Sequence, residues 1–108
     1  MSDEGGSDRE PGASSSSKGA EVRVLTIVNK KGLHARASAK FCQTVERFDA
    51  AIKVTRGHET VGGTSIMGLM MLAAGTGSTI TISIAGPEAA EAMTALCALV
   101  QAGFGEED

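Results

Sequence analysis

Aromatic residues are scarce in this chain: its 108 residues include three Phe and neither Trp nor Tyr. Proteins that bind single-stranded nucleic acid use exposed aromatic rings as platforms on which bases stack, so the composition disfavours that class. The charge points the same way, because 13 acidic and 10 basic residues leave a net charge of −3, whereas nucleic-acid-binding domains are commonly basic. We expect no nucleic acid among the partners, although a local basic patch is compatible with this composition.

Cysteine is also scarce, and metal-binding patterns are missing. Cys42 and Cys97 are too few and too far apart in the sequence for a disulfide framework. Each falls on the face of a predicted helix and is interpreted as a small core residue. No group of residues has the spacing of metal ligands, and neither a dinucleotide nor a P-loop fingerprint occurs. We therefore expect no metal and no cofactor.

Long apolar runs are absent as well. The longest uncharged stretch, residues 60–87, is interrupted by glycines and hydroxyl side chains, unlike the continuous apolar span of a membrane helix. The first twenty residues also lack the basic-then-apolar pattern of a signal peptide. We expect a protein of the reducing cytoplasm that makes no membrane contact.

Residues 1–19 differ from the remainder of the chain in composition. Ten of them are Gly or Ser, and none is a branched aliphatic residue. Such a segment cannot bury enough apolar surface to offset the entropy of ordering it, which predicts a disordered tail. Residues 20–108 are then one folded domain, because this length suits a single core.

Hydrophobic periodicity predicts alternating strands and helices within residues 20–108. β-branched or alternating segments predict strands at residues 22–28, 51–55, 59–61 and 79–85. Apolar residues at helical spacing predict helices at residues 35–48, 65–73 and 87–102. The order β-α-β-β-α-β-α indicates an α+β fold of two layers, with the helices on one face of a mostly antiparallel sheet.

The segment most informative about function is residues 29–40, NKKGLHARASAK, in which four basic residues and no acid surround His34. A helix that starts near Ala35 places His34 at or just before the N-cap. Helix N-termini offer unpaired N–H groups and a partial positive charge, and phosphate commonly occupies such a site. The same field favours a neutral, nucleophilic imidazole, and a phosphoryl group on it would lie beside the guanidinium of Arg36.

A solvated histidine in a basic turn is the alternative interpretation of this segment. The glycine at 32, Arg36 and the lack of a nearby acid together favour chemistry over that alternative. From these residues alone, the two interpretations have about equal weight.

Two motifs carry a resemblance to a known family. Gly32-Leu33-His34-Ala35-Arg36 resembles the active-site signature of the HPr family, the phosphocarrier proteins of the bacterial phosphoenolpyruvate-dependent phosphotransferase system. Residues 64–70, TSIMGLM, resemble the regulatory-serine segment of that family, at the family's separation from the first motif. The similarity covers about residues 21–105. The amino-acid sequence of residues 27–36, IVNKKGLHAR, resembles the nitrogen-related branch of the HPr family more than its other members.

The resemblance implies a function as well as a fold. It implies that enzyme I phosphorylates His34 on its ring Nδ1, that Arg36 stabilises the phosphate, and that a histidine on a IIA-type protein then accepts the group. It implies an HPr-like open-faced sandwich, with a four-stranded antiparallel sheet of order 1-4-2-3 and three helices on one face. Ala37 stands where many members have proline, which removes some preorganisation of the loop but keeps a good helix former. We expect a monomer that works as a covalent shuttle and has no small-molecule active site of its own.

Ser65 and the apolar run after it form the second candidate region. Its position before an apolar helical run makes Ser65 a candidate helix N-cap, worth ~1 kcal/mol. The resemblance implies instead that Ser65 is the site that an HPr kinase/phosphorylase modifies, and the two roles are compatible. The run supplies more large apolar side chains than a short helix buries, so we expect about half of Ile66, Met67, Met70 and Met71 to be exposed as a docking patch. Lys31 and Lys40 would attract acidic partner surfaces.

A regulatory binding protein of the same fold, which docks according to its phosphorylation state, is the alternative function. A small RNA-binding α+β domain is disfavoured because the predicted strands lack aromatic residues. His58 follows Gly57 in a predicted hairpin turn and is interpreted as a solvated surface residue, since nothing at metal-ligand spacing accompanies it.

Overall fold

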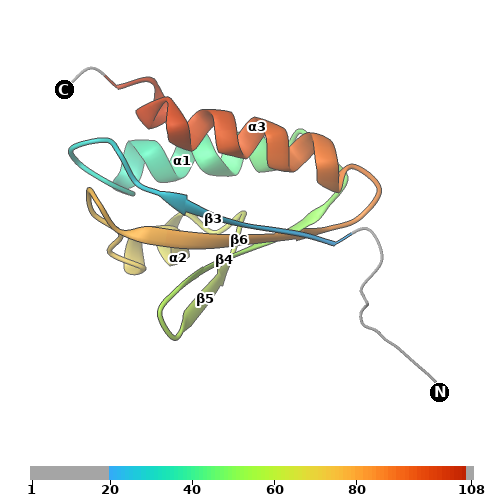
Figure 1. Ribbon diagram of the computed structural model, residues 1–108, viewed down its shortest axis with the longest axis horizontal. Helices are drawn as coiled ribbons and strands as arrows, with labels where there is room; N and C mark the ends of the chain where they lie inside the picture. The colour runs from blue at the N-terminus through green and yellow to red at the C-terminus, as the bar shows by residue number, and fades with distance from the viewer. Residues whose placement is uncertain (1–19, 107–108) are drawn as a thin grey trace.

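The computed structural model describes residues 20–106 (Figure 1). The predicted tail, residues 1–19, and residues 107–108 lie outside the described residues, so the predicted domain 20–108 stays a prediction. With the labels of Figure 1, the elements follow the order β3 (Glu21–Thr26), α1 (Ala35–Val45), β4 (Ala51–Arg56), β5 (Glu59–Gly62), α2 (Ile66–Met71), β6 (Thr79–Ala85), α3 (Ala89–Gln101) and the 3-10 turn η1 (Gly103–Gly105). The predicted order β-α-β-β-α-β-α is confirmed.

The four strands form one antiparallel sheet of order β3-β6-β4-β5. Counted along the chain this order is 1-4-2-3, which confirms the topology that the resemblance implies. β6 is central and pairs with both β3 and β4, so that Val24 lies opposite Thr81 and Val54 lies opposite Ile82. β3 and β5 are the edge strands.

The core lies between the sheet and the helices, and α1 and α3 lie side by side over one face of the sheet (Figure 1). The alternation of β6 explains this packing, because Ile80, Ile82 and Ile84 are all buried while the residues between them face away. Apolar burial of this kind is the main force that holds the two layers together. α2 packs against α1 and β5. The result is the open-faced two-layer sandwich that the sequence predicts.

The first strand has apolar residues on both faces, and the structure shows which face is buried. Leu25 is 8% exposed and belongs to the core, whereas Val22 and Val24 are more than 60% exposed. The strand ends at Thr26 and not at residue 28, although Ile27 continues inward and is fully buried. Within residues 20–106, no helix combines the length and apolar content that crossing a membrane requires.

Candidate functional site

The loop between β3 and α1 is fixed by backbone contacts with residues 74 and 75. Gly32 has a φ of 63°, and a Cβ built on it would lie 2.3 Å from the carbonyl oxygen of Ala74. Only glycine takes this backbone conformation and this close approach without strain. The next residue, Leu33, donates its N–H to that same oxygen at 3.0 Å and buries its side chain. The loop therefore delivers the following residue to a defined place at the surface.

His34 is the N-cap of α1, as the sequence predicts. Its backbone is extended, with a φ of −75° and a ψ of −177°, and its side chain makes no capping hydrogen bond. The backbone of the turn is held instead by Ser38, whose N–H donates to the His34 oxygen at 2.8 Å and whose buried hydroxyl donates to the Leu33 oxygen at 3.1 Å. The imidazole is 27% exposed. Because the side chain takes no part in capping, the imidazole faces the pocket at the N-terminal end of α1.

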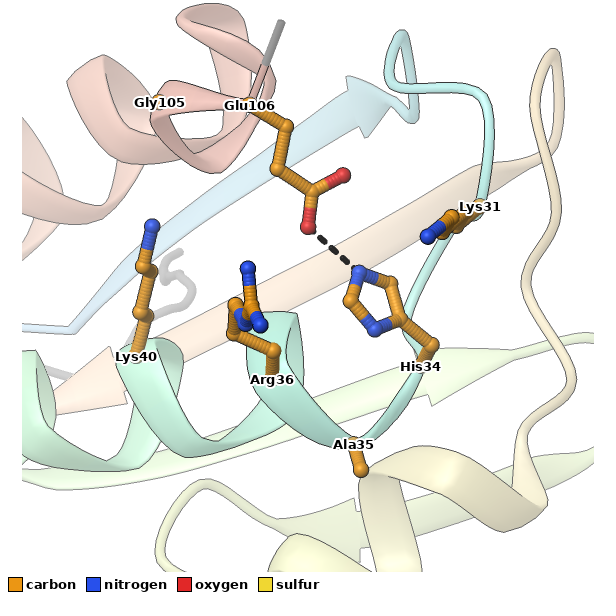
Figure 2. Close-up of a pocket in the computed structure, with 7 residues that line it drawn as sticks. All are labelled: Lys31, His34, Ala35, Arg36, Lys40, Gly105 and Glu106. Carbon is orange, nitrogen blue, oxygen red and sulfur yellow. Dashed lines mark hydrogen bonds and ion pairs between the residues drawn. The ribbon is translucent and has the colours of Figure 1, made fainter. Parts of the chain in front are cut away.

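A polar pocket surrounds the imidazole (Figure 2). Its walls come from the loop before α1, the first turns of α1 and the end of the chain after α3, and they consist of Lys31, His34, Ala35, Arg36, Lys40, Gly105 and Glu106. Figure 2 shows Arg36 between Lys40 and His34, with the Glu106 side chain extending toward the imidazole from the opposite wall. Lys31, Arg36 and Lys40, the three basic residues predicted for the site, thus line one pocket. Such a pocket suits an anion.

The sequence segment around His34 contains no acid, but the fold brings one to the imidazole. Oε2 of Glu106 pairs with Nε2 of His34, and Oε1 of Glu106 accepts a hydrogen bond of 3.0 Å from Nδ2 of Asn29. These bonds, first that from Asn29 and then that from His34, hold the pKa of Glu106 below its usual value, and the charges of His34 and Lys31 add to the effect. Because 72 residues separate His34 from Glu106, no local pattern indicates the pair.

The burial of Phe104 brings Glu106 to the site. Phe104 is fully buried despite a φ of 59°, which is uncommon for a residue with a side chain. Its carbonyl oxygen accepts a hydrogen bond of 2.7 Å from Nζ of Lys40. Lys40, predicted as a docking residue, therefore also anchors the turn at Phe104 to α1. A phenylalanine between two glycines was the only sequence signal for this turn.

The Glu106 contact distinguishes the two ring nitrogens of His34. A carboxylate can only accept, so Nε2 carries the proton of this hydrogen bond. In the neutral ring, Nδ1 then holds the free lone pair. Figure 2 shows this second nitrogen on the side of the ring away from Glu106. The contact with Glu106 thus engages Nε2 and leaves Nδ1 as the ring nitrogen with an available lone pair.

Ser65 is the N-cap of α2, and its Oγ accepts a hydrogen bond of 2.9 Å from the N–H of Gly68. This contact confirms the capping interpretation. The prediction that about half of the four large apolar side chains after Ser65 are exposed was too low, because all four are exposed. The inward side of this segment is filled by Leu69 and Leu72 instead. The docking patch consists of Ile66, Met67, Met70 and Met71, at 42%, 71%, 41% and 71% exposure.

The remaining sequence predictions concern residues outside the pocket. Cys42 and Cys97 are free and buried, as expected, and burial together with the charge of Glu46 raises the pKa of the Cys42 thiol. His58 is exposed, as expected. Over the described range 20–106, no three His, Cys, Asp or Glu side chains gather into a group that could hold a metal ion.

The Glu106 contacts predict a pH-dependent contribution to stability. A carboxyl whose pKa is lowered by folding stabilises the folded state above the unfolded-state value, here 4.5, and loses that effect as the pH falls through the folded-state value. We expect Glu106→Gln to melt below the wild type near neutral pH and to approach it in acid below that range. Thermal melts across this pH range check the prediction, with Glu59→Gln on the exposed hairpin as the control. A melting difference that grows as the pH falls contradicts it.

Comparisons with known proteins show which proteins this chain is similar to. Residues 21–102 match the sequence model of a family described as the PTS HPr component phosphorylation site. The chain is 54% identical over 84 residues to phosphocarrier protein HPr of Cupriavidus necator, covering 78% of this chain and 94% of that protein. It is 45% identical over 84 residues to phosphocarrier protein NPr of Shewanella violacea, covering 78% and 92%. The crystal structure of an HPr from Thermoanaerobacter tengcongensis superposes with a TM-score of 0.78 at 39% identity, covering 82% of this chain and 99% of that one.

Proposed function

The chain belongs to the HPr family of phosphocarrier proteins, and from that premise we propose that His34 carries the phosphoryl group between two larger proteins of the phosphotransferase system. Enzyme I, charged from phosphoenolpyruvate, is the donor, and a histidine of a IIA-type protein is the acceptor. The observation that carries the proposal is the pairing of Nε2 with Glu106, which leaves Nδ1 as the nucleophile beside three cations. The assignment to the nitrogen-related branch stays a prediction.

In the proposed reaction, the lone pair on Nδ1 of His34 attacks the phosphorus atom carried by enzyme I. The new N–P bond forms as the donor's bond to phosphorus breaks, and the bonding electron pair returns to the donor. The ring of His34 gains positive charge in this step, and the Glu106 carboxylate on Nε2–H offsets that charge. In the transfer to the IIA-type protein, the acceptor histidine attacks the phosphorus atom. The N–P bond of His34 breaks, and its electron pair returns to Nδ1.

The phosphoryl group itself would lie at the start of α1. Unpaired N–H groups of the first turn and the guanidinium of Arg36 are the donors that a phosphate prefers. Lys31 and Lys40 line the same pocket and add positive charge. Phosphoryl transfer depends chiefly on positioning and on charge stabilisation. The proposed transfer therefore uses no further catalytic group from this chain. The docked partners supply the rest of the transfer site.

A direct test is to incubate the chain with enzyme I and phosphoenolpyruvate and to measure its intact mass. We expect the addition of one phosphoryl group that is labile in acid and stable in alkali, as a phosphoramidate is. An unmodified chain that still binds enzyme I would overturn the proposal and favour the alternative, a regulatory binding protein of the same fold.

The proposed role of Arg36 predicts that charge alone cannot replace it. Arg36 is exposed at the start of α1, so Arg36→Lys should melt like the wild type. Lysine keeps the charge but loses the planar fork that holds two phosphate oxygens, so we expect transfer from enzyme I to be slower. Steady-state transfer assays measure this, with Arg23→Lys on β3 as the control. Equal rates for the Arg36→Lys variant and the wild type would show that charge suffices.

The docking patch is the proposed contact surface for enzyme I and the IIA-type protein. It belongs to α2, which packs against α1, and Figure 2 shows this helix next to Ala35, the residue after His34. Exposed methionines adapt to differently shaped partners. A partner that covers the patch therefore reaches the His34 pocket as well.

Ser65 lies at the edge of the docking patch, which makes it a candidate switch for an HPr kinase/phosphorylase. Aspartate caps a helix as well as serine does, so we expect Ser65→Asp to melt like the wild type. Its new charge lies next to Ile66 and Met67, which a partner must cover. Enzyme I should therefore bind it more weakly. Titration of enzyme I activity measures this, with Gln101→Glu on α3 as the charge control, and equal titration curves would remove α2 from the docking surface.

A further inference from the structure

Asn29 is a buried polar residue that the proposed chemistry does not use directly. It lies five residues before His34 and is 1% exposed. Its Nδ2 donates two hydrogen bonds, one of 2.9 Å to the Gly32 oxygen and one of 3.0 Å to Oε1 of Glu106. Its backbone oxygen accepts from the Gly32 N–H at 3.2 Å and from the Thr76 hydroxyl at 2.6 Å. One residue thus joins the loop before His34 to the end of the chain.

We propose that Asn29 is a positioning residue for phosphoryl transfer at His34, and that it acts by holding the Glu106 carboxylate against Nε2 of the imidazole. The inference rests on the proposed function. The chemical link is continuous, because Oε1 of Glu106 accepts from Asn29 while Oε2 pairs with His34. Asn29 touches neither the imidazole nor the place of the phosphoryl group, so its effect passes through the carboxylate.

The surroundings of Glu106 explain why its carboxylate needs to be held. Lys31, Arg36 and Lys40 line the same pocket and attract the same negative charge. A carboxylate that swung toward one of these cations would leave Nε2 without an acceptor, and the ring proton could then occupy either nitrogen. The amide of Asn29 fixes one oxygen of Glu106 and directs the other to the ring. The proton consequently stays on Nε2, and the lone pair stays on Nδ1.

The unpaired oxygen of Asn29 argues for a role beyond folding stability. Its Oδ1 is buried and has no hydrogen-bond partner among residues 20–106. Rotation of the amide by half a turn would aim Oδ1 at the oxygens of Gly32 and Glu106, so the two donor contacts determine the orientation. A buried acceptor without a partner costs stability. In this orientation both amide protons of Asn29 bind groups of the site, while its oxygen stays unpaired. Local departures from full hydrogen bonding of this kind occur at functional positions.

The test compares Asn29→Asp with a control in the neighbouring loop, between α2 and β6. Asn29→Asp is nearly isosteric, removes both donors and places an acceptor beside Glu106. Thr76→Val is the control, because the Thr76 hydroxyl binds the oxygens of Asn29 and Lys30 and makes no bond to Glu106. Nitrogen-15 NMR of the His34 ring in the full chain, recorded where the imidazole is neutral, reports the tautomer. Transfer from enzyme I is measured on the same samples below their melting temperatures.

We expect the wild type and Thr76→Val to hold the proton on Nε2, and Asn29→Asp to populate the other tautomer. Transfer should fall by about tenfold or more in Asn29→Asp, since loss of orientation at a reacting group costs up to about 10²-fold. Glu106→Gln should slow transfer to a similar degree, and the double variant should be no slower than either single variant, because the two residues act as one unit. Asn29→Ala removes the same donors without adding charge and should show the same tautomer change.

Three results would overturn the inference. The first is an unchanged tautomer in both Asn29 variants, the second is wild-type transfer by Asn29→Asp, and the third is equal slowing by Thr76→Val. Failure of the proposed function is a different result, because the wild type itself would then take up no phosphoryl group from enzyme I.

Discussion

His34→Ala is expected to take up no phosphoryl group from enzyme I under conditions in which the wild type takes up one. The loss should be complete, because the imidazole is the covalent acceptor and alanine offers no atom to receive the group. The fold should survive the change. The side chain of His34 is 27% exposed, makes no capping bond and pairs only with Glu106 among the described residues. A change at the surface with few partners alters stability little.

The other histidine provides the matched control. His58 lies exposed in the turn between β4 and β5, away from the pocket. We expect His58→Ala to be phosphorylated like the wild type. Intact mass after incubation with enzyme I and phosphoenolpyruvate, followed by acid treatment, measures both variants. An acid-labile phosphate that persists in His34→Ala would show that another residue is the acceptor.

The predicted elements agree best with the structure where one face of a segment is uniformly apolar. β6 spans the predicted residues 79–85 because its three isoleucines alternate with hydroxyl residues, and a shift by one residue would expose all three. Element ends were less predictable. The apolar spacing of α1 continues to Phe48, but the helix ends at Val45. There the N–H groups of Arg47 and Phe48 bond three residues back, which tightens the last turn.

Some residues of the candidate site could be predicted from the sequence, and others could not. His34 and Arg36 were predictable because one short segment holds both and a helix N-terminus gives them a chemical meaning. Glu106 was not predictable, because its place depends on the burial of Phe104 in the core and on packing between distant segments. Asn29 was missed for a related reason: a polar residue after a strand suggests a turn, and only the folded structure shows that its amide faces Glu106.

The site also depends on the glycine that begins its motif, and Gly32→Ala should be the most destabilising single change in the loop. A left-handed φ of 63° costs about 1–2 kcal/mol for a residue with a Cβ. The new Cβ would also lie 2.3 Å from the oxygen of Ala74 and 2.8 Å from Cα of Gly75, which are backbone atoms that cannot rotate away. The loop must therefore move, and the hydrogen bond from the Leu33 N–H to Ala74 is lost or stretched.

Gly57→Ala isolates the cost of that close approach, because Gly57 has a φ of 62° but nothing lies within 4 Å of an added Cβ. We expect Gly57→Ala to lose only the backbone cost, and Gly32→Ala to lose ~3 kcal/mol or more, since strain and overpacking add. For a domain of this size, that loss lowers the melting temperature by roughly 12–24 °C. Thermal melts measure both variants, and transfer from enzyme I should fall only in Gly32→Ala, whose loop carries His34. Equal melting temperatures would mean that the loop moves aside freely, and the position of His34 would then not depend on its contact with residues 74 and 75.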